Sequence, residues 1–175
     1  GYTGSSVYNI DPKKKVMYMG DADTKGELKP DGSGNPGWRI DTEYSSSHYR
    51  DEEPKHLTGT VSLYRPEDGH RTGSVVFQLC FAKNEEFDSG NKTQRTIFGK
   101  IVDGLTETKE LTDTELYRDT DEYDKKKDKI NKALGATPEE KKARREKLEA
   151  KGNRPTEAIV IESVTLEPYK EKEKE

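Results

Sequence analysis

The chain has 175 residues, of which 28% are hydrophobic and 38% are charged. Its 31 basic side chains nearly balance its 35 acidic ones, and the net charge of −4 excludes the strong charge imbalance typical of disordered chains and of nucleic-acid-binding domains. No stretch approaches the roughly 18 consecutive apolar residues of a membrane-spanning helix. We therefore expect a soluble protein with one modest core, no membrane-spanning segment and no nucleic-acid partner.

Short apolar runs, rich in β-branched and aromatic residues, predict most of the fold. They are separated by Gly, Pro, Asp and Ser, a pattern typical of strands in an antiparallel sheet or barrel. The runs cover residues 7–10, 16–19, 60–64, 75–82, 96–102 and 158–166. The sequence therefore predicts a mainly β fold. The single cysteine, Cys80, lies between Leu79 and Phe81 in one of these runs, which predicts a buried thiol and excludes an internal disulfide.

Residues 112–155 differ from the rest, because charged side chains dominate and apolar ones are few. Thr137 followed by Pro138 and two glutamates is typical of a helix start, and Gly152 stands where that helix should end. Upstream, residues 112–134 before Gly135 predict another helix. We expect a helical hairpin inserted before the last strand, either as a solvated excursion or as a docking element for a partner.

These patterns divide the chain. We expect a barrel over residues 1–111, the charged helical insertion over 112–155, the closing strand of the barrel over 156–166 and a disordered charged tail over 167–175. The chain begins with Gly1 and not with Met. Processing after import into an organelle and truncation both explain this start, so the sequence leaves the compartment open.

Three separated segments resemble cyclophilin-type peptidyl-prolyl cis-trans isomerases. The first comprises the glycine turn at residues 1–4, the strand at 7–10 and the strand at 17–21, which ends in Gly-Asp. The second is the glycine-rich loop at 32–38. The third is the most specific: it runs from Gly73-Ser74 through residues 76–83 and 87–88 to the Phe-Gly-Lys-Ile-Val-Asp-Gly stretch at 98–104. Residues 155–164 resemble the closing strand of the family.

The resemblance implies an antiparallel β-barrel capped by helices. Compared with the family pattern, this chain starts late, so the barrel is expected to be incomplete at the N-terminus, and the insertion at 112–155 is longer than the usual connection. A barrel that lacks strands exposes edges with unpaired N–H and C=O groups. We therefore expect a protein partner, or an upstream part of the same chain, to complete or cover the open sheet edge.

Most polar catalytic positions of the family carry other residues in this chain. The resemblance places Asn9 at the position of the arginine that donates toward the prolyl nitrogen, and Tyr18 and Val75 at two glutamine positions. Arg65 or its neighbour Tyr64 falls at the substrate-holding asparagine. Glu86 takes the tryptophan position, and the histidine position falls in residues 91–95, which contain no His. No catalytic residue is assigned with certainty, and Arg65 is the candidate substitute for the lost donor.

The apolar part of the implied substrate-binding pocket is better preserved. Phe77 matches the aromatic floor of the pocket, Phe87 stands where the family has leucine, and Val16 or Met17 matches a methionine of the pocket wall. Phe77, Phe87 and one of these two residues would form a shallow hydrophobic site for a proline-containing peptide. Phe77 and Met17 fit ordinary core positions equally well, because both lie within or beside predicted strands.

Metal and cofactor chemistry finds little support in the sequence. His48, His56 and His70 lie far apart in polar segments, without the spacing of a metal site. Four acids surround the glycine-rich loop but lack the spacing of a Ca²⁺ loop; they are Asp21, Asp23, Glu27 and Asp31. We expect no metal and no cofactor.

The altered catalytic positions favour a noncatalytic, cyclophilin-like structural or interaction subunit of a larger assembly. Two alternatives stay open. One is an active or weakly active peptidyl-prolyl isomerase, and the other is a proline-peptide binder without turnover.

Overall fold

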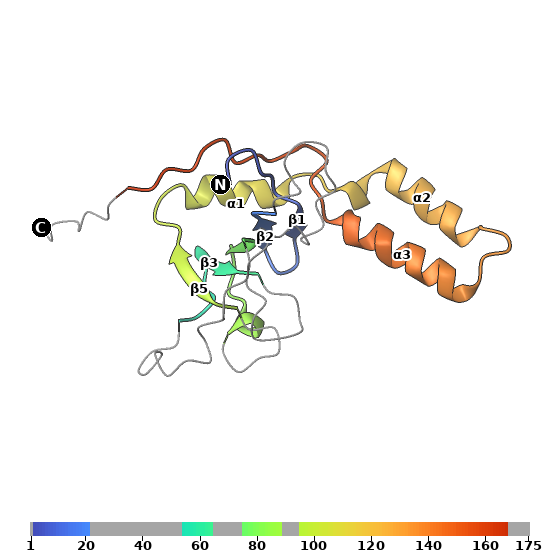
Figure 1. Cartoon of the computed structure of the whole chain (residues 1–175), viewed down its shortest axis with the longest axis horizontal. Helices are drawn as coiled ribbons and strands as arrows, with labels where there is room; N and C mark the ends of the chain where they lie inside the picture. The colour runs from blue at the N-terminus through green and yellow to red at the C-terminus, as the bar shows by residue number, and fades with distance from the viewer. Residues whose placement is uncertain (1, 22–53, 65–74, 89–94, 168–175) are drawn as a thin grey trace, which may run out of the picture.

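The computed structural model describes residues 2–21, 54–64, 75–88 and 95–167. Its centre is a small sheet with helix α1 across one side, and a helical hairpin, α2 and α3, projects away from the sheet at one end (Figure 1). Within the described residues, no helix is both long enough and apolar enough to cross a bilayer.

The sheet has five strands, all paired antiparallel. Their spatial order is β1-β2-β4-β3-β5, so β1 and β5 form the two edges and the sheet is not closed into a barrel. The five strands fall within or overlap five of the predicted apolar runs, which confirms the antiparallel sheet. Their bounds are Asn9–Asp11 (β1), Val16–Met19 (β2), Thr60–Leu63 (β3), Phe77–Cys80 (β4) and Ile97–Lys100 (β5).

Alternation along the strands separates two faces of the sheet. On the first face, Ile10 lies opposite Met17, and Met17 lies opposite Leu79. This face builds the larger core, to which Val7, Met19, Phe81 and Leu116 also belong. Helix α1 (Leu105–Glu110) contributes Leu105 to the same core. The second face carries a smaller cluster formed by Val16, Cys80 and Phe87, of which Phe87 lies in the short 3-10 helix η3 (Glu85–Phe87).

The segment predicted as the closing strand lies beside the first residues of the chain. The amide of Gly4 donates to the carbonyl of Ile161 at 2.8 Å, and the amide of Val7 donates to the carbonyl of Ile159 at 2.9 Å. Ser6 and Val160 form an antiparallel bridge. The expected strand over 158–166 is thus reduced to a short pairing around Val160, and residues 162–167 beyond it are exposed. The predicted domain boundaries stay predictions.

The helical hairpin follows two 3-10 turns, η4 (Leu111–Asp113) and η5 (Tyr117–Asp119). Helix α2 covers Asp121–Asn131 and helix α3 covers Pro138–Gly152. The first predicted helix is therefore shorter than expected, because the hydroxyl of Thr120 caps α2 by accepting from the amide of Tyr123 at 3.3 Å.

The start of α3 agrees with the sequence pattern. The hydroxyl of Thr137 accepts from the amide of Glu140 at 3.1 Å, and the carboxylate of Glu140 accepts from the amide of Thr137 at 3.0 Å. The end differs by one residue. Gly152 is the last residue of α3 and Asn153 is its cap; a Cβ on Gly152 would lie 3.2 Å from the Cβ of Arg118, which is tighter than an ordinary contact.

Helix α1 was not among the elements predicted from the sequence. It begins after Gly104, whose φ of +69° is a left-handed conformation that favours glycine. The hydroxyl of Thr108 donates to the carbonyl of Gly104 at 2.7 Å. The helix follows β5 and carries the chain across the first face of the sheet toward the hairpin (Figure 1).

Candidate functional site

The second face of the sheet carries a row of polar side chains that crosses neighbouring strands. Asn9 of β1 lies opposite Tyr18 of β2, Tyr18 lies opposite Gln78 of β4, and Gln78 lies opposite Ser62 of β3. Directly opposed residues on one face of an antiparallel pair are close neighbours. We refer to Asn9, Tyr18, Gln78 and Ser62 as the polar row. Gln78 and Ser62 are fully buried.

Three members of the polar row carry buried polar atoms that have no hydrogen-bond partner among the described residues. These atoms are Oδ1 of Asn9, Oε1 of Gln78 and Oγ of Ser62. The amide nitrogen of Gln78 makes only a long contact of 3.9 Å with the sulfur of Cys80. Buried polar groups in folded proteins are nearly always hydrogen-bonded, so this group of unsatisfied atoms distinguishes the row from the rest of the sheet. Because Gln78 and Ser62 are fully buried, their polar groups lie in the interior of the fold and not on an open surface.

Aromatic rings and a guanidinium line the same region. The ring centroid of Tyr18 lies 6.3 Å from that of Tyr8 and 5.5 Å from that of Tyr64. The guanidinium carbon of Arg95 lies 4.8 Å from the ring centroid of Tyr64 and 5.3 Å from that of Phe87. Both distances are within the range of cation–π attraction. Arg95 is therefore held between two rings beside the polar row.

Two tyrosines and the cysteine beside the row keep their protons at neutral pH. Burial raises the pKa of Tyr8 and of Tyr18 well above the usual tyrosine range, so both hydroxyls keep their protons and can donate. Burial also raises the pKa of Cys80 to about 11, although hydrogen bonds from Gln78 and Asn84 act in the opposite direction. Because nucleophilic cysteines react as thiolates, Cys80 is a structural thiol and not a reactive one. Its burial confirms the sequence prediction.

The buried ring of His56 packs against Phe87. The backbone amide of His56 donates to Oδ1 of Asp88 at 2.8 Å, and Nδ1 of its ring lies 3.0 Å from the same oxygen. The ring packs edge-on against Phe87, with centroids 5.7 Å apart. Burial lowers the pKa of His56 despite the opposing effect of Asp88, so the imidazole is neutral at neutral pH. This geometry joins the segment at 54–64 to the segment that carries Phe87.

The structure divides the four predicted pocket residues between the two faces of the sheet. Val16 and Phe87 pack together with Cys80 on the face of the polar row. Met17 is buried in the larger core on the opposite face, and Phe77 packs against that core. The Phe77 ring also makes edge-on contacts with Tyr2 and Phe98, at centroid distances of 5.2 and 6.3 Å. Only Val16 and Phe87 therefore lie on the face that carries Asn9.

The remaining predicted positions lie in different environments. Tyr64 contributes to the aromatic lining, whereas Arg65 lies outside the described residues. Glu86 is exposed, and its carboxylate lies 2.9 Å from the ammonium group of Lys14. Val75 precedes β4, and its carbonyl lies against Gly20. Among the acids and histidines considered for metal binding, Asp21 and His56 are buried and the others lie outside the described residues.

Sequence reasoning did not single out Gln78, Ser62 and Arg95 as site residues. A signal for Gln78 was present, because a glutamine in an otherwise apolar strand shares a face with Cys80 two residues away. Its alignment with Asn9, Tyr18 and Ser62 depends on the pairing of four strands, which no local pattern reveals. Within the part of the chain that the structure describes, no group of three His, Cys, Asp or Glu residues could hold a metal ion.

The half-buried residues of this face, Asn9, Tyr18 and Tyr64, carry an amide and two phenol groups, which can donate or accept hydrogen bonds. The guanidinium of Arg95 lies near the row and interacts with two rings. The Cys80 thiol and the Tyr8 and Tyr18 phenols are protonated at neutral pH, so none of these three groups is an activated nucleophile.

A solved structure shares this fold. A cyclophilin type peptidyl-prolyl cis-trans isomerase of Cryptosporidium parvum, solved in the presence of the dipeptide Ala-Pro, matches with a TM-score of 0.58 and 16% sequence identity. The match covers 97% of this chain and 78% of the Cryptosporidium chain, and at this identity it shows a shared fold. No curated protein matches this chain in sequence.

Comparison with protein families gives the more specific result. The family described as cyclophilin type peptidyl-prolyl cis-trans isomerase/CLD matches residues 1–134, which is more than half of the chain. This match and the open antiparallel sheet agree with the resemblance found in the sequence. The chain belongs to the cyclophilin type peptidyl-prolyl cis-trans isomerase/CLD family.

Proposed function

We propose that this chain is a noncatalytic interaction domain built on the cyclophilin scaffold, and that it serves as a subunit of a larger protein assembly. The observation that carries this proposal is the identity of Asn9. It occupies the position that the sequence resemblance aligns with the catalytic arginine of the family, and its side-chain oxygen is buried without a partner beside the protonated Tyr18.

The chemistry of prolyl isomerisation explains why this position matters. Rotation about an X–Pro bond faces an uncatalysed barrier of about 18–20 kcal/mol, which arises from amide resonance. A charged donor aimed at the prolyl nitrogen weakens that resonance, and loss of one such preorganised donor typically lowers the rate by about 10²–10³-fold. Asn9 is neutral, and an amide donates less strongly than a guanidinium. We therefore assign no isomerase activity to this chain.

The two sheet edges support the interaction role. The β1 edge is covered, because the amide of Ile10 donates to the carbonyl of Asn153 at 2.8 Å and residues 4–7 pair with 159–161. No described strand covers the outer side of β5. Phe98 on β5 is 56% exposed and Val102, just beyond it, is 94% exposed. An exposed strand edge with apolar side chains is a ready site for an added strand. A partner strand at β5 is our proposal for the open edge.

One observation favours a second candidate function, a proline-peptide binder with or without turnover. Arg95 places a guanidinium on the same face as the unsatisfied acceptors of Asn9, Gln78 and Ser62. If a bound peptide drew Arg95 away from its aromatic neighbours, a charged donor would reach the face from a position different from that of the family's arginine. The Cryptosporidium relative, solved with Ala-Pro, supports testing short proline peptides first.

Separate measurements of binding and turnover distinguish these functions. Binding is followed by titration of the chain into a fluorescent Ala-Pro peptide, and turnover is followed by a protease-coupled isomerisation assay on the same sequence. The proposal expects no acceleration above the buffer rate. Acceleration that Arg95→Gln abolishes, while Lys14→Gln leaves it unchanged, would instead establish an isomerase that uses Arg95.

The proposed addition of a partner strand at β5 is tested by a separate experiment. Sedimentation of the full chain is expected to show concentration-dependent association that Phe98→Asp suppresses. Leu134→Asp is the control, because Leu134 is likewise an exposed apolar residue but lies at the hairpin, away from β5. A wild-type chain that stays monomeric at high concentration would contradict a free edge at β5.

A further inference from the structure

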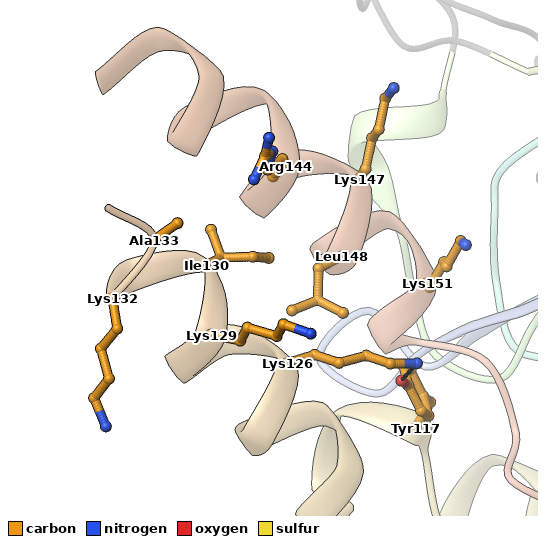
Figure 2. Close-up of a pocket in the computed structure, with 10 residues that line it drawn as sticks. All are labelled: Tyr117, Lys126, Lys129, Ile130, Lys132, Ala133, Arg144, Lys147, Leu148 and Lys151. Carbon is orange, nitrogen blue, oxygen red and sulfur yellow. Dashed lines mark hydrogen bonds between the residues drawn. The ribbon is translucent and has the colours of Figure 1, made fainter. Parts of the chain in front are cut away.

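The helical hairpin carries a groove that the interaction role described above does not use. The groove has a volume of about 740 Å³ and lies between α2 and α3. Figure 2 shows Ile130 of α2 and Leu148 of α3 pointing toward each other at its floor, with long cationic side chains around them. Tyr117 and Ala133 complete its uncharged lining.

All charged residues that line the groove are basic. They comprise three side chains from α2 and its end and three from α3: Lys126, Lys129, Lys132, Arg144, Lys147 and Lys151. Acidic residues occur on both helices, but none of them lines this groove. The hairpin therefore concentrates positive charge on one surface of a chain whose net charge is −4.

Most of this charge is not neutralised within the described part of the chain. Lys126 lies 2.6 Å from the carboxylate of Glu122 and donates to the hydroxyl of Tyr117 at 2.8 Å, and Lys132 lies 3.3 Å from Asp128. The other four cations, Lys129, Arg144, Lys147 and Lys151, form no salt bridge with a described residue.

The spacing of the cations makes this arrangement unfavourable in the isolated hairpin. Arg144, Lys147 and Lys151 recur at intervals of three and four residues, so they share one face of α3 with Leu148. Like charges at such spacings destabilise a helix, and cations of α2 face the same groove. An anionic partner would remove this repulsion.

The floor of the groove indicates which kind of anion fits. Ile130 and Ala133 are partly buried and Leu148 is 8% exposed, so an apolar strip runs between the cations. A nucleic acid backbone would use the cations and leave this strip without a partner, whereas an amphipathic helix with acidic flanks would contact both.

We propose that the groove between α2 and α3 binds an acidic amphipathic helix of a protein partner. Apolar side chains of that helix contact Ile130 and Leu148, and its carboxylates pair with Arg144, Lys147, Lys151 and Lys129. The proposal deepens the interaction role proposed above by assigning a second surface and the chemistry of its partner. It does not depend on the isomerase measurement.

The test uses the full chain and a fluorescent designed peptide that is helical, with leucines at intervals of three and four residues and glutamates on both flanks. Anisotropy titration at near-physiological salt is expected to show saturable binding. Two matched peptides, one with lysine in place of glutamate and one with serine in place of leucine, are expected to bind at least about tenfold more weakly. Equal binding of the serine peptide, or of a single-stranded oligonucleotide of equal charge, would overturn the proposal.

Matched variants locate the binding surface. The double substitution R144E/K147E reverses two groove cations and is expected to weaken binding by about tenfold or more. K142E/R145E makes the same charge change on exposed positions of α3 that do not line the groove, and it is expected to have less than about a twofold effect. Equal losses of binding in the two variants would show that only the net charge of the chain matters, and would overturn the assignment of the groove.

The apolar strip is tested by Ile130→Ser, with Leu134→Ser as its exposed control outside the groove. The first is expected to weaken binding and the second to leave it unchanged. Circular dichroism of each variant checks that α2 and α3 are still formed. A folded Ile130→Ser variant with wild-type affinity would contradict a role for the strip. Because isomerase activity is measured independently, its presence would overturn the noncatalytic proposal without affecting this one.

Discussion

Asn9 and Tyr18 lie directly opposite each other in the antiparallel pair formed by β1 and β2. Both side chains therefore share one face of the sheet, and there they begin the polar row that continues through Gln78 and Ser62. The resemblance places both residues at positions where the family has catalytic polar groups. Here one is neutral with an unsatisfied buried oxygen, and the other is a protonated phenol.

The close packing of Val75 and Phe77 around Gly20 predicts that a single added methyl group strongly destabilises the fold. Its φ is +90°, and a Cβ would lie 2.5 Å from the carbonyl oxygen of Val75 and 2.9 Å from the Phe77 ring. Gly20→Ala is therefore expected to destabilise the fold by more than the roughly 1–2 kcal/mol that a left-handed conformation alone costs. Gly135→Ala is the control, because its φ is +76° and its surroundings are open. Urea unfolding measures both, and equal losses would contradict the packing argument.

The burial of His56 predicts that stability depends on pH. Burial lowers its pKa in the folded state below the value of about 6.5 that applies to the unfolded chain. The unfolded chain then binds the proton more readily, so the contribution of His56 is fully present above about pH 6.5 and is lost as the pH falls through the folded-state pKa.

The matched variant for this prediction is His56→Asn, whose amide nitrogen can still donate to Asp88 but does not titrate. Chemical unfolding at a series of pH values between neutral and acidic is expected to show a smaller decrease in the free energy of unfolding for the variant than for the wild type. Identical pH profiles would show that His56 does not titrate in this way.

The buried thiol of Cys80 predicts slow alkylation. Its pKa of about 11 leaves little thiolate at neutral pH, and the side chain is fully buried. Iodoacetamide is expected to label the native chain far more slowly than the chain in denaturant. Because Cys80 is the single cysteine, mass spectrometry reads the modification directly. Equal rates in the two states would contradict the burial of this strand.

The capping box at the start of α3 predicts a measurable loss of helix. Thr137→Ala removes the hydroxyl that accepts from the Glu140 amide, and loss of such a cap typically costs about 1 kcal/mol. Thr137→Ser retains the acceptor and is the control. Hydrogen exchange of the α3 amides is expected to accelerate in the alanine variant alone, and equal exchange in both variants would count against the cap.

Local patterns predicted the strands and the start of α3, because strand propensity and helix capping depend on neighbouring residues. They missed α1, since Leu105–Glu110 has no side-chain cap and no apolar periodicity. They also placed the hairpin's first helix too early, because the effective cap is Thr120. Polar, exposed helices of this kind depend on their context more than on their own sequence.

The candidate site was harder to predict from the sequence than the fold. Alternation shows which residues of one strand share a face, but it does not show how strands are paired. Alternation separates Val16 from Met17, which are neighbours in β2. The polar row, in contrast, requires three strand pairings. The position of Arg95 over Tyr64 and Phe87 joins three segments that are distant in sequence.

The exchange rate between the cis and trans forms of an Ala-Pro peptide, measured by exchange NMR with the full chain present, tests the central claim most directly. The account predicts the same rate with and without the chain, even where line broadening or titration shows that the peptide is bound. A rate that rises in proportion to the concentration of the chain, and that returns to the buffer value in Arg95→Gln, would contradict it.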